Sequence, residues 1–123
     1  MNTKRTEAEI LAAVLVGLAE RRIVAWRSNT GAARAPNGRM VRFGLKGAAD
    51  IIGLLPGGRF LAIECKAPLG RVSMAQLRFG HAISKAGGCY LVARDAQTCL
   101  DTIDHIISNT PAHVASENKE STK

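Results

Sequence analysis

The chain has 123 residues and a mass of 13.1 kDa, which fits one domain of ordinary size. A content of 46% hydrophobic and 22% charged residues is typical of a globular protein, and it excludes collagen, a coiled coil and wholesale disorder. No window approaches the ~18 uninterrupted apolar residues of a membrane span, and no apolar signal segment opens the sequence, so we expect a cytoplasmic protein without a membrane anchor.

The positive charge of the chain is large and unevenly distributed. The formal charge is +7 and the isoelectric point is near 9.9. Between Arg21 and Arg94 there are thirteen lysines and arginines but only two acids, Asp50 and Glu64. Solubility alone would explain a net charge, but a solvated surface usually mixes both signs. The pattern therefore favours an anionic partner, most often nucleic acid, and it singles out the two acids.

The first expected helix runs from Glu7 to Arg21. Thr6 and Glu9 form a capping-box pattern at its start, and apolar residues follow at helical spacing. Because Glu9 serves the cap and Glu7 shares the face of Ile10, we expect Glu7 to point inward.

Extended segments are expected next in the chain. They lie at Ile23–Arg27, Met40–Phe43, Ile51–Leu55 and Phe60–Cys65. The intervening Ser28–Gly38 stretch is rich in Asn, Gly, Ala and Pro and is interpreted as a loop. Pro56-Gly57-Gly58 is a strong hairpin signal, so the last two strands should be antiparallel neighbours.

The C-terminal half alternates helix and strand. A second capping box, Ser73 and Gln76, starts a helix that should end at Gly87-Gly88, and Cys89–Ala93 is the next strand. Asp95 caps a helix over 96–107, and 110–123 is expected to be a disordered polar tail after a 1–109 domain. The order predicts an α/β sandwich around a small mixed sheet. The aromatic residues expected in its core are Trp26, Phe43, Phe60 and Phe79.

The two isolated acids lie at the same end of the expected hairpin. Asp50 begins one strand, Glu64 ends the other, and Lys66 shares the face of Glu64. Two close carboxylates repel each other unless a cation joins them, and Mg²⁺ or Mn²⁺ prefers such oxygen ligands. With Lys66 orienting water or neutralising a phosphorane, the set favours metal-dependent phosphodiester hydrolysis. The spacing alone is weak, since Glu64 and Lys66 would also make an ordinary exposed charge pair.

Several motifs in order resemble the PD-(D/E)XK nucleases, and in particular their VRR-NUC branch. The core of the resemblance is Gly47-Ala48-Ala49-Asp50, the Pro56-Gly57-Gly58-Arg59 turn and Ile63-Glu64-Cys65-Lys66. Supporting features are Thr6-Glu7-x-x-Ile10, Trp26-Arg27-Ser28-Asn29, Gly70-x-x-Ser73-x-x-Gln76 and Gly87-Gly88. The resemblance extends from about Thr6 to Arg94, and it departs from the usual pattern at Ala49 and at Cys65.

The resemblance implies a restriction-endonuclease-like fold with an α-β-β-β-α-β core and Mg²⁺- or Mn²⁺-dependent DNA cleavage. It carries metal ligation onto Asp50, Glu64, the backbone carbonyl of Cys65 and, through water, Glu7. It gives catalytic roles to the same three carboxylates, to Lys66 and to Gln76.

The resemblance also implies a homodimer that cuts branched DNA such as four-way junctions, in a bacterial or phage-infected cytoplasm. The cations around the expected loop are candidates for phosphate contacts. The candidate DNA-binding residues are Asn29, Arg34, Arg39, Arg42 and Lys46. Cys65, Cys89 and Cys99 lack zinc-site spacing and are interpreted as free thiols of a reducing compartment.

Other functions stay open at this point. A non-catalytic DNA-binding module would share the basic stretch but would not need both acids and Lys66. A restriction-type enzyme, a nickase or an RNA-processing nuclease would share the whole core motif. A small-molecule phosphatase or transferase is disfavoured, because no glycine-rich loop that cradles phosphate precedes a helix.

Overall fold

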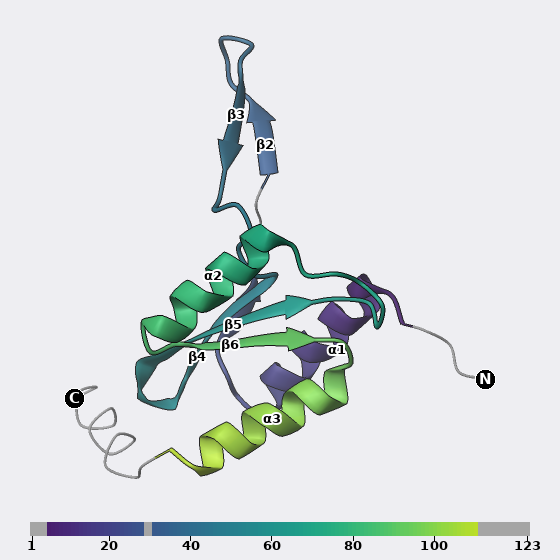
Figure 1. Cartoon of the computed structure of the whole chain (residues 1–123), viewed down its shortest axis with the longest axis vertical. Coiled ribbons are helices and arrows are strands. Elements are labelled where there is room, and N and C mark those ends of the chain that lie inside the picture. The colour runs from purple at the N-terminus through teal and green to yellow at the C-terminus, as the bar shows by residue number, and fades with distance from the viewer. Residues whose placement is uncertain (1–4, 29–30, 111–123) are drawn as a thin grey trace.

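The computed structural model describes residues 5–28 and 31–110, apart from the Phe43 side chain. Its elements are α1 (Glu7–Glu20), β1 (Ala25–Arg27), β2 (Gly31–Arg34), β3 (Met40–Phe43), β4 (Ile51–Leu55), the 3-10 turn η1 (Pro56–Gly58), β5 (Arg59–Cys65), α2 (Met74–Lys85), β6 (Cys89–Ala93) and α3 (Ala96–Ser108) (Figure 1). Asn29 and the tail residues 111–123 lie outside the described residues.

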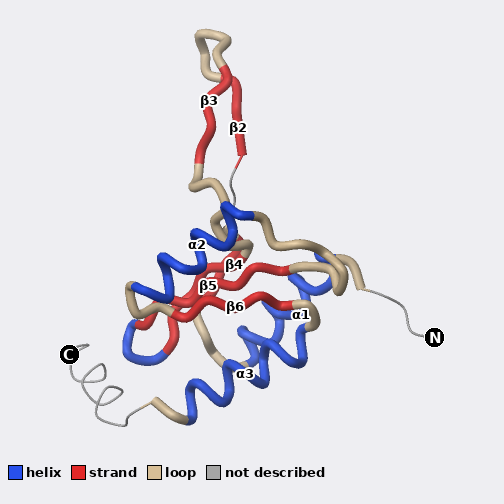
Figure 2. Tube along the Cα trace, in the orientation of Figure 1, coloured by secondary structure: helices blue, strands red, loops and turns tan. Residues whose placement is uncertain are grey.

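A four-stranded mixed sheet organises the body of the protein. Its order is β1-β4-β5-β6, in which β5 and β6 are parallel and the other neighbours are antiparallel. Helices α1 and α3 lie on one side of this sheet and α2 lies on the other (Figure 2). The predicted α/β sandwich with a small mixed sheet is therefore confirmed.

The main core lies between the sheet and the helix pair α1 and α3. Alternate residues of β4 and β5, such as Ile51, Leu61 and Ile63, are fully buried against Ile10 of α1 and Ile103 of α3. Burying an aliphatic side chain of this size contributes about 1.5–3 kcal/mol. The same strands turn their other residues toward the α2 side, where apolar residues such as Ile52 and Ala62 are joined by one acid, Glu64.

Both predicted capping boxes are present, and they set where helices begin. Thr6 accepts from the Glu9 amide, and the Glu9 carboxylate accepts from the Thr6 amide. Ser73 and Gln76 make the same reciprocal pair at the start of α2. The starts of α1 and α2 are therefore fixed by local sequence.

The expected loop at Ser28–Gly38 is wrong in part, because Gly31–Arg34 forms a strand. β2 pairs with β3 from Gly31↔Phe43 to Arg34↔Met40, and this hairpin projects away from the body (Figure 1). The turn is closed by hydrogen bonds between Ala35 and Arg39 and between Gly38 and Ala35. Backbone pairing and a Pro-Asn-Gly turn make the hairpin, without the apolar alternation that sequence patterns detect.

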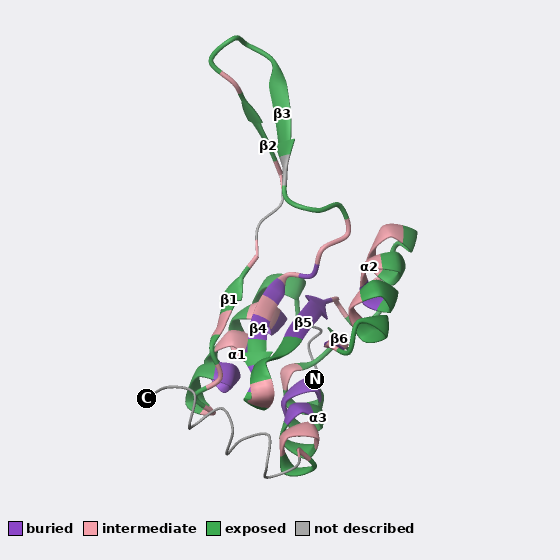
Figure 3. Cartoon of the chain, turned by 90° about the vertical axis from the view of Figure 1, so that its left-hand side faces the viewer, coloured by how far each residue is buried: buried purple, intermediate pink, exposed green. Residues whose placement is uncertain are grey.

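The expectation of an aromatic core is also wrong for two residues. Trp26 is 49% exposed and Phe60 is 38% exposed. Both lie on the α2 side of the sheet. Helix α2 contacts β6 and β5 but leaves β1 open, which exposes Trp26 (Figure 3), and Phe60 lies at the start of β5, next to the η1 turn. Phe79 is half-buried against Tyr90, and the Phe43 side chain lies outside the described residues.

Within residues 5–28 and 31–110, no helix combines the length and the apolar character needed to cross a membrane.

Candidate active site

Asp50 and Glu64 meet at one end of the sheet. Ile51 pairs with Ile63, so the residues next to them, Asp50 and Glu64, flank the same point of the ladder. The Asp50 carboxylate accepts a hydrogen bond from the Cys65 backbone amide at 2.8 Å. We call this end, where β4 begins and β5 and β6 finish, the acidic end.

Glu64 is a buried acid with incomplete hydrogen bonding. It is 3% exposed, and its Oε2 accepts from the Gln76 side-chain amide at 2.7 Å. The Lys66 ammonium lies 3.9 Å from the same oxygen. Its other oxygen, Oε1, is buried and has no hydrogen-bond partner within the described part of the chain. A buried, unpartnered carboxylate oxygen is costly, so this atom is a place either for a proton shared with Asp50, whose hydrogen bond raises the pKa of Glu64, or for a further ligand.

Burial and charge shift the titration of Glu64. Burial raises its pKa, the negative charge of Asp50 raises it further, and the Lys66 ammonium opposes both, with a result of about 7. One nearby cation therefore does not compensate for two carboxylates at this end of the sheet.

Lys66 is held by the sheet although it lies beyond the end of β5. Its backbone amide donates to the Ala93 carbonyl at 2.9 Å, which extends the β5–β6 pairing by one step. Its side chain is mostly buried and leans toward Glu64. The Cys65 thiol between them is buried in the core, and burial raises its pKa to about 12. Only the backbone of Cys65 therefore belongs to the site.

Glu7 reaches the loop beside the site from α1, on the side that its helical phase predicts. It is nevertheless exposed, and the first turn of α1 extends past the ends of β5 and β6 (Figure 1). Its carboxylate accepts a long hydrogen bond from the Ala67 amide at 3.5 Å. The structure thus brings Glu7 to the loop after Lys66, and not into hydrogen-bond contact with Asp50 or Glu64.

Sequence reasoning missed Arg94, which holds that same loop. Its Nη1 atom donates to the carbonyls of Ala67 at 3.0 Å, Pro68 at 3.2 Å and Gly70 at 2.7 Å. Arg94 follows β6 directly, so the loop is tied to the neighbouring strand. Nothing in the sequence separated Arg94 from the other cations, because its role depends on the pairing of β6 with β5.

The candidate DNA-binding cations lie apart from the two acids. Arg34 and Arg42 are on the β2–β3 hairpin, Arg39 follows its turn, and Lys46 lies in the segment that returns to Asp50; all four are exposed. Asn29 falls outside the described residues. The cations therefore line a projection and its base, and not the sheet itself.

The metal expected at the acidic end can be tested against the donors present. Among the described residues, no three Asp, Glu, His or Cys side chains are grouped so as to hold a metal ion. Two carboxylates and backbone carbonyl oxygen are available there, with Glu7 one loop away. Mg²⁺ usually takes one or two carboxylates and keeps several waters, so the unpartnered Glu64 Oε1 fits such an ion.

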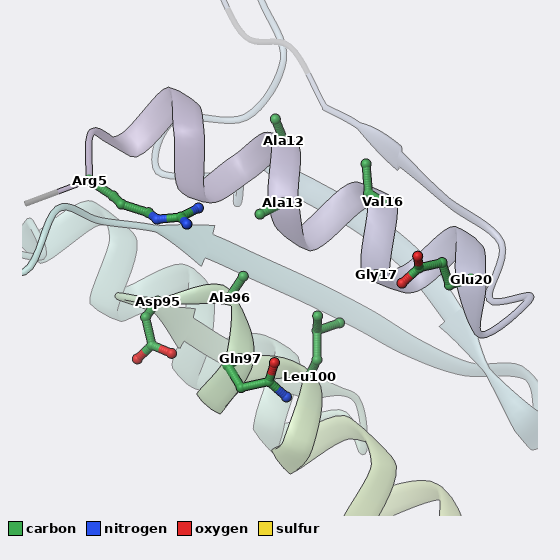
Figure 4. Close-up of a pocket in the computed structure, with 10 residues that line it drawn as sticks. All are labelled: Arg5, Ala12, Ala13, Val16, Gly17, Glu20, Asp95, Ala96, Gln97 and Leu100. Atoms are coloured by element: carbon green, nitrogen blue, oxygen red, sulfur yellow. The ribbon is translucent and has the colours of Figure 1, made fainter.

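A separate groove lies between α1 and α3 on the other side of the sheet (Figure 4). It has a volume of about 640 Å³, and small residues such as Ala13 and Gly17 line it. The acidic residues Glu20 and Asp95 are at its rim, and it is bordered by none of Asp50, Glu64 and Lys66.

Compared with family models, curated proteins and solved structures, the chain gives no significant match.

Proposed function

We propose that this protein is a divalent-metal-dependent DNA endonuclease with a restriction-endonuclease-like fold of the VRR-NUC type. The observation that carries the proposal is the buried Glu64 carboxylate, which has one oxygen without a partner beside Asp50 and Lys66. An acid pair of this kind is unfavourable for a purely structural role, because charge is buried without full compensation.

Mg²⁺ or Mn²⁺ is the proposed cofactor. Asp50, Glu64 and the Cys65 carbonyl would hold it, with Glu7 acting through water. A bound divalent ion supplies a water of lowered pKa and stabilises negative charge on phosphate.

The protein's own groups prepare the site for that ion and for the substrate. Gln76 fixes the orientation of the Glu64 carboxylate through the 2.7 Å hydrogen bond. The Cys65 amide fixes Asp50 in the same way. Lys66, 3.9 Å from Glu64, would orient the attacking water or neutralise the charge that develops on the phosphorane. The partly closed surroundings of Lys66 and Glu64 strengthen these electrostatic contacts.

The proposed substrate is DNA, and specifically branched DNA such as a four-way junction. Support comes from the +7 charge and from the exposed cations Arg34, Arg39, Arg42 and Lys46 around the projection. Asn29, which lies outside the described residues, stays a candidate from the sequence alone. A small domain has little surface for reading bases, so shape and phosphate backbone are the features it would recognise.

The proposed assembly is a homodimer. Val24, Trp26 and Leu54 share the open side of the sheet and are 64%, 49% and 45% exposed. β1, which carries Trp26, is an edge strand of the four-stranded sheet. A second copy of the chain is the occupant we propose for this surface, since two-fold pairing would present two sites to a symmetric junction. We expect Trp26→Glu to shift the sedimentation coefficient from that of a dimer to that of a monomer. Val16→Glu, which changes an exposed residue of α1, is the control and should leave the coefficient unchanged. A wild-type protein that sediments as a monomer would exclude the dimer.

We propose the reducing cytoplasm of a bacterium or phage-infected cell as the compartment. The three cysteines are free and buried, which suits a thiol-rich environment.

The test is cleavage of labelled duplex, single-stranded, flapped and four-way-junction DNA in Mg²⁺, Mn²⁺ or EDTA. Asp50→Ala and Lys66→Ala should abolish cutting, whereas the exposed-residue controls Asp101→Ala and Lys85→Ala should cut like wild type. Binding without cutting in every metal would support a non-catalytic DNA-binding module. A preference for RNA, or cutting of only one strand of a duplex, would support metal-dependent phosphodiester hydrolysis but would exclude branched DNA as the preferred substrate.

A further inference from the structure

None of the described side chains of the β2–β3 hairpin, which exclude that of Phe43, is buried. The hairpin is a two-stranded ribbon, and Met40 and Val41 are 58% and 51% exposed (Figure 3). Isolated two-stranded hairpins are marginally stable in water. A partner that covers the ribbon would therefore stabilise it.

The charge of the hairpin indicates the nature of that partner. Residues 31–49 contain four cations and no acid. The pairs Ala32↔Arg42 and Arg34↔Met40 place Arg34 and Arg42 on one face of the ribbon. Arg34 also donates to the Gly38 carbonyl at 2.8 Å, which holds its guanidinium along the hairpin. A second copy carries the same positive ribbon, so charge favours a polyanion over self-pairing.

The root of the hairpin lies at the acidic end. The Ser28 amide donates to the Asp50 carbonyl at 2.7 Å, so the chain leaves and re-enters the sheet next to the acid. Gly47, in the returning segment, packs against the backbone of Ala75 at the start of α2. The ribbon therefore projects from the point where the proposed function places the scissile phosphate.

The dimensions of the ribbon suit one groove of the double helix. Paired strands lie about 4.8 Å apart, and four residues of strand extend about 14 Å. The major groove is about 12 Å wide and about 8.5 Å deep and admits a two-stranded ribbon, whereas the minor groove is about 6 Å wide. The small side chains of Ala32 and Ala33 keep β2 thin.

We propose that the β2–β3 hairpin enters the major groove of DNA, with Arg34 and Arg42 on the phosphates of the groove wall. The inference rests on the proposed function, because that function places DNA across the acidic end. The hairpin then sets the distance between the groove it occupies and the phosphate that is cut.

The first test measures DNA affinity against salt in EDTA, where cleavage does not interfere. Each phosphate contact contributes about 0.9 to the slope of log K against log salt, so Arg34→Ala/Arg42→Ala should lower the slope by about 1.8. The control Arg78→Ala/Lys85→Ala removes two exposed cations of α2 and should leave the slope unchanged. Equal slopes for wild type and Arg34→Ala/Arg42→Ala would overturn the inference.

The second test asks which groove is occupied. DNA with glucosylated 5-hydroxymethylcytosine has a filled major groove, and netropsin fills the minor groove. Wild type should lose about tenfold or more in affinity only on the glucosylated DNA, since the phosphate contacts made by the ribbon would be lost. A variant with residues 33–41 replaced by Asn-Gly should bind both DNAs alike. Wild-type binding that is indifferent to glucosylation, or sensitive to netropsin, would overturn the inference.

The outcomes separate this inference from the proposed function. If the shortened variant loses self-association with an unchanged salt slope, the hairpin is a protein interface and the inference fails. If both binding tests succeed but no metal supports cutting, the nuclease proposal fails while the groove contact stands. If cutting occurs and neither binding test succeeds, the nuclease proposal stands while the groove contact fails.

Discussion

The side chain of Gln76 both caps α2 and holds the buried Glu64 carboxylate. Its carbonyl oxygen accepts from the Ser73 amide at 2.8 Å and completes the capping box of α2, and its amide nitrogen donates to Glu64 at 2.7 Å. The start of the helix and the orientation of the buried acid are therefore coupled. A capping box accepts either Gln or Glu at this position, so the amide is explained by Glu64 and not by the cap.

This coupling gives a prediction for Gln76→Glu. The cap is retained, but a carboxylate replaces the donor that faces Glu64, so the free energy of unfolding should fall by about 2 kcal/mol in EDTA at pH 8. Mg²⁺ should restore more stability to Gln76→Glu than to wild type, because a third carboxylate adds to the ion's ligands. Ser73→Ala, which removes the cap alone, is the control in urea unfolding; equal responses of the two variants to Mg²⁺ would contradict the coupling.

The raised pKa of Glu64 should make the free energy of unfolding depend on pH in the absence of divalent metal. That pKa is about 7 in the folded protein and 4.5 when unperturbed, so between these values the folded chain keeps a proton that the unfolded chain has lost. The free energy of unfolding should therefore fall as pH rises from about 4.5 to about 7. Urea unfolding in EDTA measures this slope, and Glu64→Gln should flatten it. Parallel profiles for the two proteins would show that Glu64 does not titrate in this range.

Gly47 and Gly38 form a matched pair for testing the root of the hairpin. Both have positive φ, +81° and +88°, but a Cβ at Gly47 would lie 2.5 Å from the Ala75 backbone, whereas Gly38 has open space around it. The left-handed backbone alone costs a non-glycine residue about 1 kcal/mol. Gly38→Ala should cost no more than this in urea unfolding, and Gly47→Ala should cost at least twice as much. Equal losses would mean that the returning segment does not pack on α2.

Arg94 is expected to act on the site through the loop that follows Lys66. Arg94→Met removes three donor contacts to that loop, so we expect faster hydrogen exchange at residues 66–70 and weaker cleavage. Arg94 is exposed, so global stability should change by about 1 kcal/mol or less.

Arg59→Met is the matched control for Arg94→Met. Arg59 also donates to backbone carbonyls, those of Gly87 and Gly88, but at the opposite end of β5. It should leave both the exchange at residues 66–70 and the cleavage unchanged. If the two variants behave alike, Arg94 has only a general structural role.

The sequence predicts the framework well because its signals are local. Two capping boxes and the Pro56-Gly57-Gly58 turn place α1, α2 and the β4–β5 pair, and this pairing brings Asp50 beside Glu64. The hairpin at Gly31–Arg34 escaped prediction because its strands bury almost nothing, although Pro36-Asn37-Gly38 was a usable turn signal.

What the sequence did not predict depends on contacts between distant segments. Arg94 reaches the 67–70 loop only because β6 adds in parallel beside β5. Trp26 is exposed because α2 covers β6 and not β1, and no local pattern encodes that choice. Glu7 is exposed because α1 begins beyond the sheet, so helical phase predicted the side that Glu7 faces but not its burial.

All three helices begin near the acidic end. Glu7 of α1 touches the loop after Lys66, Gln76 of α2 touches Glu64, and α3 starts just after Ala93, which pairs with Cys65. The amino end of each helix carries a partial charge of about +0.5 from its aligned peptide dipoles. Three such ends give this part of the surface a positive backbone potential that mutation of side chains does not remove. We expect this backbone potential to attract an approaching phosphate whichever side chains are changed. It offsets only part of the repulsion between Asp50 and Glu64, because the pKa of Glu64 is still raised to about 7.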